Sequence, residues 1–281
     1  MISEQVKIPI FQVDAFTNQV FQGNPAAICV LNEDFDDSTL QKIAAEMNLS
    51  ETAFVRIERN LPIEKQKIFP LRWFTPQVEV NLCGHATLAT AAVMFHEFCV
   101  ESDEVFFNTL SGRLSAKKTN DGIALNFPLN DPNQISAPEE LLKALGISKY
   151  VGAAYAEGVT DILIELETEL EVKYLSPDYS KLKQLDLDRK IRGVIVTSKG
   201  KGDVDFVSRF FAPWVGINED PVTGSAHTIL TPYWSKKLHK NTMKAKQISE
   251  RSGDLLVRLI EDGRVEITGK TKLVFKGELY F

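Results

Sequence analysis

The stretch NLCGHATLAT, residues 81–90, has a polar front followed by a run of small apolar residues. Cys83, Gly84 and His85 stand together where an apolar helix is predicted to begin. That helix is predicted from Gly84 to Phe98 and carries almost no charge. A helix that is apolar on all sides is a buried helix. The sequence therefore predicts a domain whose strands wrap about this helix.

A second stretch, DPVTGSAH at residues 220–227, has a similar organisation. Upstream of the two stretches, residues 72–81 and 209–218 share Arg, Phe, Pro, Val and Asn at the same offset. In each half a strand runs through a proline loop to an apolar helix opened by glycine. These matches favour an internal duplication over coincidence, and a repeat this long indicates two similar domains rather than a solenoid. We expect the two helix starts to face one interdomain cleft, a common place for small-molecule sites.

Length and composition agree with two domains. The chain has 281 residues and 44% hydrophobic residues, which is near the size at which one core divides into two. The polar segment from Leu129 to Pro138 is the predicted boundary. It separates an N-terminal domain, residues 1–129, from a C-terminal domain, residues 130–281. The last strand, about residues 272–281, is able to pack back onto the first domain.

Charge and cysteine content exclude several classes of function. The net charge of −6, with both signs mixed, disfavours nucleic-acid and anionic-membrane binding. No stretch approaches the ~18 apolar residues that span a bilayer. Three cysteines and a polar start predict a cytoplasmic protein with reduced thiols. Zinc-like cysteine and histidine spacings, a P-loop and a dinucleotide fingerprint are absent from the sequence.

The two predicted helix starts are candidate anion sites, because the first N–H groups of a helix lack internal partners and the helix dipole is positive there. Gly84 and Gly224 allow close backbone approach, although each could merely relieve backbone strain. His85 is expected to be neutral at such a position. Asp220 could serve as a routine turn cap and Ser225 as an ordinary helix N-cap.

Two further residues are ambiguous on local grounds. Glu51 lies at the mouth of a predicted strand, where an isolated glutamate is usually just solvated. Cys83 lies at a helix N-terminus, a position that lowers the pKa of a thiol, but cysteine is also a common buried residue. The sequence around each residue leaves both interpretations open.

Longer motifs give the chain a family resemblance. It resembles the phenazine-biosynthesis-like (PhzF-like) isomerases, which are related to diaminopimelate epimerase and proline racemase. The motifs occur in family order and span nearly the whole chain. One departure is Asn81, where aspartate is common. The matching segments are residues 13–17 (VDAFT), 23–27 (GNPAA), 50–55 (SETAFV), 74–76 (FTP), 82–89 (LCGHATLA), 211–213 (FAP) and 219–226 (EDPVTGSA).

The resemblance implies an α+β, diaminopimelate-epimerase-like fold with two pseudo-symmetric domains, each a β-barrel-like sheet around a central helix. It implies a cofactor-independent, metal-free isomerase that acts on a small anionic acid and can form a homodimer. By resemblance, Glu51 is the catalytic glutamate, with His85 and Asp220 as its catalytic partners. The substrate-binding residues implied are Asn24, Gly84, Gly224 and Ser225.

Three functions remain as hypotheses. The leading one is a hydrogen-shifting isomerase, in which Glu51 alone lifts a proton from a small carboxylic or amino acid and returns it on the same face. An epimerase or racemase needs two groups on opposite faces. Cys83 supplies one thiol, but Asp220-Pro221 stands where a second cysteine is expected, so a mixed Cys83/Asp220 pair is the alternative. The third hypothesis is a non-catalytic protein that binds small acids.

Overall fold

The computed structural model describes residues 6–281, and the chain divides into two compact units. The first unit runs to Asn126 and also includes Thr268–Phe281. The second unit is Phe127–Ile267. The chain passes between the units within two strands, β8 (Gly122–Pro128) and β17 (Arg264–Gly269). Among the described residues, no helix is both long and apolar enough to cross a membrane.

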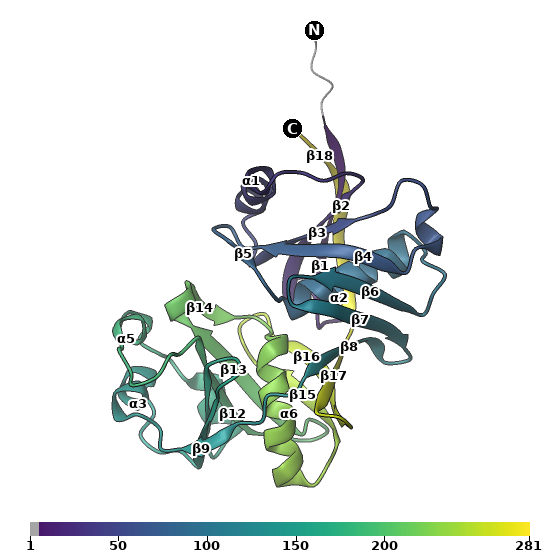
Figure 1. The fold of residues 1–281 in the computed structure, drawn as a ribbon. Helices are drawn as coiled ribbons and strands as arrows, with labels where there is room; N and C mark the ends of the chain where they lie inside the picture. The colour runs from purple at the N-terminus through teal and green to yellow at the C-terminus, as the bar shows by residue number, and fades with distance from the viewer. Residues whose placement is uncertain (1–5) are drawn as a thin grey trace. The chain divides into compact units, whose positions relative to one another are not determined.

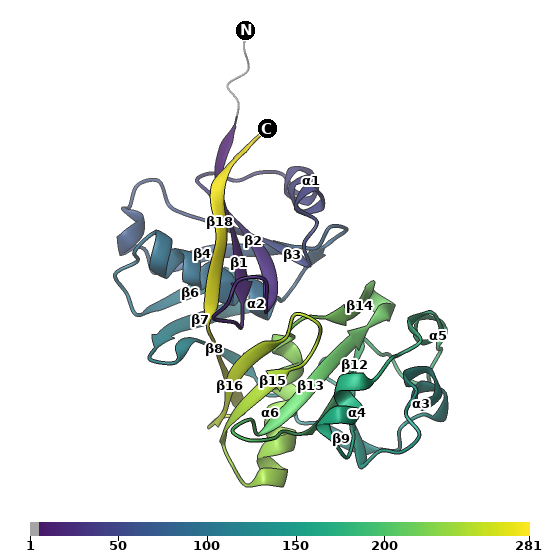
Figure 2. The ribbon, with the colours of Figure 1, turned by 180° about the vertical axis from the view of Figure 1, so that it is seen from behind.

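The first unit is a curved, mixed sheet. Its strands pair in the order β18–β1–β2–β3–β4–β6–β7–β8, with β2 parallel to β3, β4 parallel to β6, and the other pairs antiparallel. The C-terminal strand therefore pairs with the N-terminal strand, as Figure 2 shows in yellow and purple. The helix α1 (Asp37–Met47) packs on this sheet. The strands are β1 (Lys7–Ala15), β2 (Asn24–Leu31), β3 (Glu51–Arg56), β4 (Ile68–Phe74), β6 (Glu104–Thr109), β7 (Gly112–Thr119), β8 and β18 (Thr271–Tyr280), with the short β5 (Glu79–Val80) on β4.

The predicted apolar helix is the centre of this unit. The helix α2 (Gly84–Ala92) is buried from His85 to Ala92 and packs against β1, β2, β3, β7 and β18 (Figure 1). The predicted helix, Gly84 to Phe98, is helical through Glu97, but its last turn is not α-helical. Residues Val93–Glu97 form a wider π-helical turn, in which Phe98 N–H donates to Val93 O.

The second unit repeats this arrangement. Its strands pair in the order β9–β10–β11–β12–β13–β15–β16, with β11 parallel to β12 and β13 parallel to β15. The helices α3 (Glu139–Leu145), α4 (Glu169–Tyr174) and α5 (Tyr179–Gln184) enclose a further core with these strands. The strands are β9 (Asn133–Ile135), β10 (Gly152–Ala156), β11 (Asp161–Glu165), β12 (Gly193–Lys199), β13 (Phe206–Ala212), β15 (Thr242–Gln247) and β16 (Gly253–Ile260), with β14 (Ile217–Asp220) on β13.

The long helix of the second unit is α6 (Gly224–Leu238), which begins at the predicted Gly224. It remains helical through Pro232, although proline has no N–H for the carbonyl one turn earlier. That carbonyl belongs to Thr228, and it accepts a bond from Asn130 N–H at 3.3 Å. A backbone group outside the helix thus replaces the missing hydrogen bond.

Equivalent ion pairs support the duplication at the level of single residues. In the first unit, the Arg72 guanidinium makes two hydrogen bonds to the Glu79 carboxylate and lies over the Phe74 ring. In the second unit, Arg209 bonds Glu219 in the same way and lies over Phe211. Glu79 is therefore the counterpart of Glu219. The ungapped alignment of the repeat, which matched Asn81 with Asn218, is wrong beyond the proline loop, because the second loop is three residues longer.

Candidate functional site

Glu51, Cys83 and His85 come together in the first unit. Glu51 opens β3, Cys83 is the residue before α2, and His85 is the second residue of α2. The Nε2 atom of His85 lies 3.3 Å from Oε2 of Glu51, and Nδ1 of His85 lies 3.5 Å from Sγ of Cys83. The imidazole therefore stands between a carboxylate and a thiol.

Burial keeps this imidazole neutral. The His85 side chain is 6% exposed, and burial lowers its pKa to about 3. The contact with Glu51 does not have hydrogen-bond geometry, although the two atoms are within ion-pair distance. At neutral pH one ring nitrogen is a donor and the other an acceptor, as the sequence analysis expected of a histidine at a helix start. His85 can thus polarise a bound group or relay a proton without carrying a charge.

The three side chains could also hold a cation. One ligand atom from each of Glu51, Cys83 and His85 lies within 4.8 Å of the other two. Three donors, one oxygen, one sulfur and one nitrogen, are compatible with an ion such as Zn²⁺. Their sequence spacing did not reveal the set, because Glu51 comes from a different element. The prediction that the site works without a metal therefore stays a prediction.

Both long helices begin without a side-chain cap. Cys83 and Thr223 are the N-cap residues of α2 and α6, and neither side chain accepts a bond from the helix N–H groups. Gly84 and Gly224 are the first helical residues, so backbone donors are available beside each glycine. Ser225 lies inside the helix, which contradicts its interpretation as an ordinary N-cap.

Asp220 belongs to a tightly bound turn before α6. Its carboxylate accepts the hydroxyl hydrogen of Thr223. Gln247 donates to the Asp220 carbonyl at 2.7 Å and accepts from Thr223 N–H at 2.9 Å. Ser249 Oγ donates to the carbonyl of Pro221 at 2.9 Å. These supports are not predictable from the sequence, because the polar residues of β15 and of the loop after it carry no local sign of the turn that they bind.

The turns before the two helices are supported in the same way. In the first unit, Ser111 Oγ donates to the Asn81 carbonyl at 2.7 Å, as Ser249 does to Pro221. Counting from the two N-caps, Thr223 is the counterpart of Cys83. The expectation that Asp220-Pro221 occupies the place of a second cysteine is therefore wrong by three residues, and the place holds a threonine whose hydroxyl is far less acidic than a thiol.

The remaining predicted residue is Asn24. It opens β2 and is fully buried. Two residues further along β2, Ala26 lies directly beside Glu51 of the parallel strand β3. Strand pairing thus carries Asn24 to the same end of the sheet as the proposed base.

Two residues outside α6, Arg192 and Asp161, support the start of this helix, and the sequence did not predict them. Arg192, which precedes β12, donates to both carboxylate oxygens of Asp161, the first residue of β11. The same guanidinium donates to Ser225 Oγ at 3.0 Å. Arg192 is separated from Ser225 by 33 residues, and only the pairing of β11 with β12 places Asp161 beside it. The sole local signal was a charged residue directly before an apolar strand.

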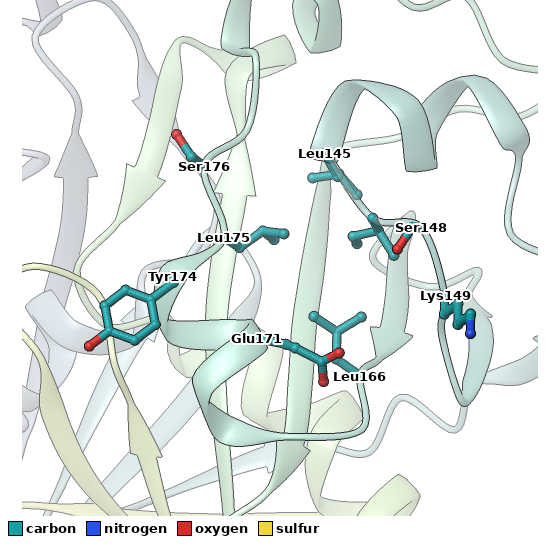
Figure 3. Close-up of a pocket in the computed structure, with 10 residues that line it drawn as sticks. Leu145, Ser148, Lys149, Leu166, Glu171, Tyr174, Leu175 and Ser176 are labelled. Atoms are coloured by element: carbon teal, nitrogen blue, oxygen red, sulfur yellow. The ribbon is translucent and has the colours of Figure 1, made fainter.

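Three cavities formed by the described residues contain none of the predicted site residues. One of about 400 Å³ in the second unit is lined by Leu145, Leu166, Glu171 and Tyr174, among others (Figure 3). Because its lining combines leucines with scattered polar groups and contains no residue of either helix start, we do not assign the reaction to it.

Comparison with known proteins places the chain in a family. Residues 13–277 match the model of the phenazine biosynthesis-like (PhzC–PhzF) proteins. An uncharacterized isomerase of Halalkalibacterium halodurans is 47% identical over 275 residues, covering 96% of this chain and 98% of that protein. A crystal structure of a PhzF-family protein of Enterococcus faecalis has a TM-score of 0.90 and 44% identity, covering 98% of this chain and 100% of that one.

The fold and the relatives therefore define an isomerase of mixed α and β structure, and the chain belongs to the phenazine biosynthesis-like family. The predicted fold is confirmed. A hydroxyproline epimerase of Agrobacterium vitis has the same fold with a TM-score of 0.59 at 9% identity, covering 98% of this chain and 93% of that one. At that identity the likeness concerns the fold alone.

Proposed function

We propose that the protein is a hydrogen-shifting isomerase of a small carboxylic or amino acid. In the proposed reaction, the Glu51 carboxylate takes a proton from carbon beside the substrate carboxylate or carbonyl. The C–H bonding pair moves into the substrate as an enolate-like anion, and a new O–H bond forms on Glu51. Glu51 then returns the proton to another carbon on the same face, which relocates the double bond.

The observation that carries this proposal is the contact of Glu51 with a neutral His85 at an uncapped helix start. The developing negative charge requires fixed donors, and the N–H groups beside Gly84 are such donors. The His85 N–H can polarise the substrate because the ring stays uncharged. In the second unit, we propose Gly224 and Ser225 as substrate-binding residues and Asp220 as a residue that orients the substrate.

One asymmetry between the units favours a single proton-transferring group. Phe74 and Phe211 are equivalent, and their strand partners are Thr52 and Val194. The preceding residues are Glu51 and Gly193, so the position that holds a carboxylate in the first unit holds glycine in the second. A Cβ at Gly193 would lie 2.3 Å from the Phe210 ring, so this place cannot hold a second glutamate without a shift of that ring.

The alternative is an epimerase that uses Cys83 and Asp220. The Cys83–His85 contact favours it, because an imidazole beside a thiol can accept its proton. The same contact is equally consistent with a thiol that only fixes the imidazole ring. The two mechanisms differ in which substitution stops proton exchange.

The test is incorporation of solvent deuterium, followed by NMR, across a panel of amino, hydroxy and unsaturated acids. We expect Glu51→Gln to lower the exchange rate by about 10²-fold or more, because a positioned acid or base contributes about that much. Cys83→Ala should retain exchange, and the exposed Glu46→Gln serves as the matched control. Exchange that survives in Glu51→Gln but is lost in Cys83→Ala would establish the thiol mechanism instead.

A further inference from the structure

The Arg192–Asp161 pair is built into the second unit more firmly than a surface ion pair. The Asp161 side chain is fully buried, and Arg192 bonds both of its oxygens. The guanidinium also lies over the Phe210 ring, with 5.2 Å from Cζ to the ring centre. A planar guanidinium held by a fork of hydrogen bonds and an aromatic face has little freedom to turn.

One guanidinium nitrogen of Arg192 reaches the site proposed above. Its Nη2 atom donates to Ser225 Oγ at 3.0 Å, so the hydroxyl oxygen is an acceptor in this contact. Within residues 6–281, Ser225 Oγ has no assigned acceptor for its own hydrogen. The hydroxyl hydrogen must therefore point away from Arg192. A hydroxyl that accepts from a cation is also a stronger donor to its next partner.

The charges around Arg192 decide whether it attracts the substrate or positions another group. Asp161 is directly bonded to it, and the Asp220 carboxylate adds to its electrostatic surroundings. Two carboxylates thus compensate one guanidinium, and little positive charge is left to draw an anion. The remaining role of Arg192 is to hold a neighbouring group in a fixed orientation.

We propose that Arg192, held by Asp161, is a positioning residue that fixes the Ser225 hydroxyl as a donor toward a carboxylate oxygen of the substrate. The inference rests on the proposed function for the presence of that carboxylate. By strand register, Asp161 of the second unit corresponds to Ala26 of the first unit, and Gly193 corresponds to Glu51. At this pair of corresponding positions, the first unit thus has the proton-transferring Glu51, and the second unit has Asp161, which holds the arginine that orients the Ser225 hydroxyl.

The test uses acetate and acetamide, which have nearly the same shape but differ in charge and in acceptor capacity. Binding is followed in the whole protein by the backbone amide NMR signals of Gly224 and Ser225. In the wild type we expect acetate to bind more tightly than acetamide. Arg192→Met should weaken acetate binding about tenfold and leave acetamide nearly unchanged, whereas Arg192→Lys should restore part of the preference. Arg189→Met, which removes an exposed arginine three residues away, is the matched control.

A double-mutant cycle separates positioning from general support of the fold. If Arg192 acts through Ser225, Arg192→Met should have little further effect on acetate binding in a Ser225→Ala background. Equal weakening of acetate and acetamide, or full additivity of the two substitutions, would overturn the proposal. So would a wild-type protein whose Gly224 and Ser225 amides do not respond to acetate.

The two proposals fail in different ways. Glu51→Gln is expected to keep the acetate response while losing deuterium exchange. If Glu51→Gln loses exchange but Arg192→Met binds acetate normally, the isomerase assignment holds and the positioning role is wrong. If Arg192→Met loses acetate preference while Glu51→Gln still exchanges, the positioning role holds and Glu51 is not the base.

Discussion

At the scale of single residues, burial decides the protonation of two histidines. His85 and His227 are both nearly inaccessible, and burial lowers their pKa values to about 3 and about 4. In His227 a hydrogen-bonding contact of Nδ1 with Thr223 O, 2.8 Å apart, opposes the effect in part. The sequence predicted neutrality for His85 from its helix start, but the stronger cause is desolvation, which depends on the surrounding strands.

These histidines should make stability fall in mild acid. In the unfolded chain a histidine binds a proton near pH 6.5, whereas in the folded protein these two remain neutral to about pH 4 or below. Unfolding therefore takes up protons, and the free energy of unfolding should decrease as the pH falls below about 6.5, by roughly 2 kcal/mol per histidine at pH 5. Urea unfolding at pH 7.5 and pH 5 measures the loss. His85→Gln should show a smaller loss, and an unchanged pH dependence would contradict the assignment.

At the scale of secondary structure elements, the sequence predicted segments that have clear periodicity. Strands were predicted at residues 68–74 and 122–128 and a helix at residues 224–238, and β4, β8 and α6 have these bounds. The prediction missed β10, whose sequence GAAYA is rich in small residues, and β15, whose sequence TMKAKQ contains two lysines. In β15 the lysines alternate with buried Met243 and Ala245, so its basic character hid a regular strand.

The duplicated Arg–Glu pairs allow a direct comparison of buried and exposed interactions. The Arg209 side chain is 10% exposed and also donates to three backbone carbonyls around the end of α4, those of Val172, Lys173 and Leu175. The Arg72 side chain is 34% exposed. We expect Arg209→Met to destabilise the protein by about 3–5 kcal/mol, because it leaves buried acceptors and Glu219 without their partner.

Arg72→Met is the matched control for that prediction, and it should cost about 1 kcal/mol or less. Urea unfolding of the two variants gives both values. Equal losses would mean that burial does not set the contribution of these pairs.

At the scale of the whole molecule, the last strand closes the first unit. β18 pairs with β1 along the whole of β1, from the pair of Lys7 and Tyr280 to the pair of Ala15 and Thr271. The side chains of Ile8 and Ile10 in β1 belong to the core beneath α1. The last strand of the first unit therefore follows the whole second unit in the sequence. Local sequence indicates a strand here, but the partner of that strand lies more than 250 residues away.

Deleting residues 271–281 should therefore destabilise the first unit selectively. The deletion leaves the β1 edge without hydrogen-bond partners and uncovers part of the core. Hydrogen exchange followed by mass spectrometry should show faster exchange in β1 and β2 and little change in β12 and β13. Phe275→Ala, which alters an exposed side chain of β18, is the control. Unchanged protection of β1 in the shortened chain would contradict this view.

By itself, the sequence determined the family, the buried helix after Cys83, the repeated helix starts and the residues Glu51, His85, Asp220 and Ser225 as candidates. These are local patterns, because periodicity, glycine position and motif order can be read along the chain. Only the tertiary structure decided that His85 lies between Glu51 and Cys83, that Thr223 is the counterpart of Cys83, and that Arg192 donates to Ser225. The reason is physical: strand pairing and burial bring together residues tens of positions apart, and neither the pairing register nor desolvation is encoded in any one stretch of sequence.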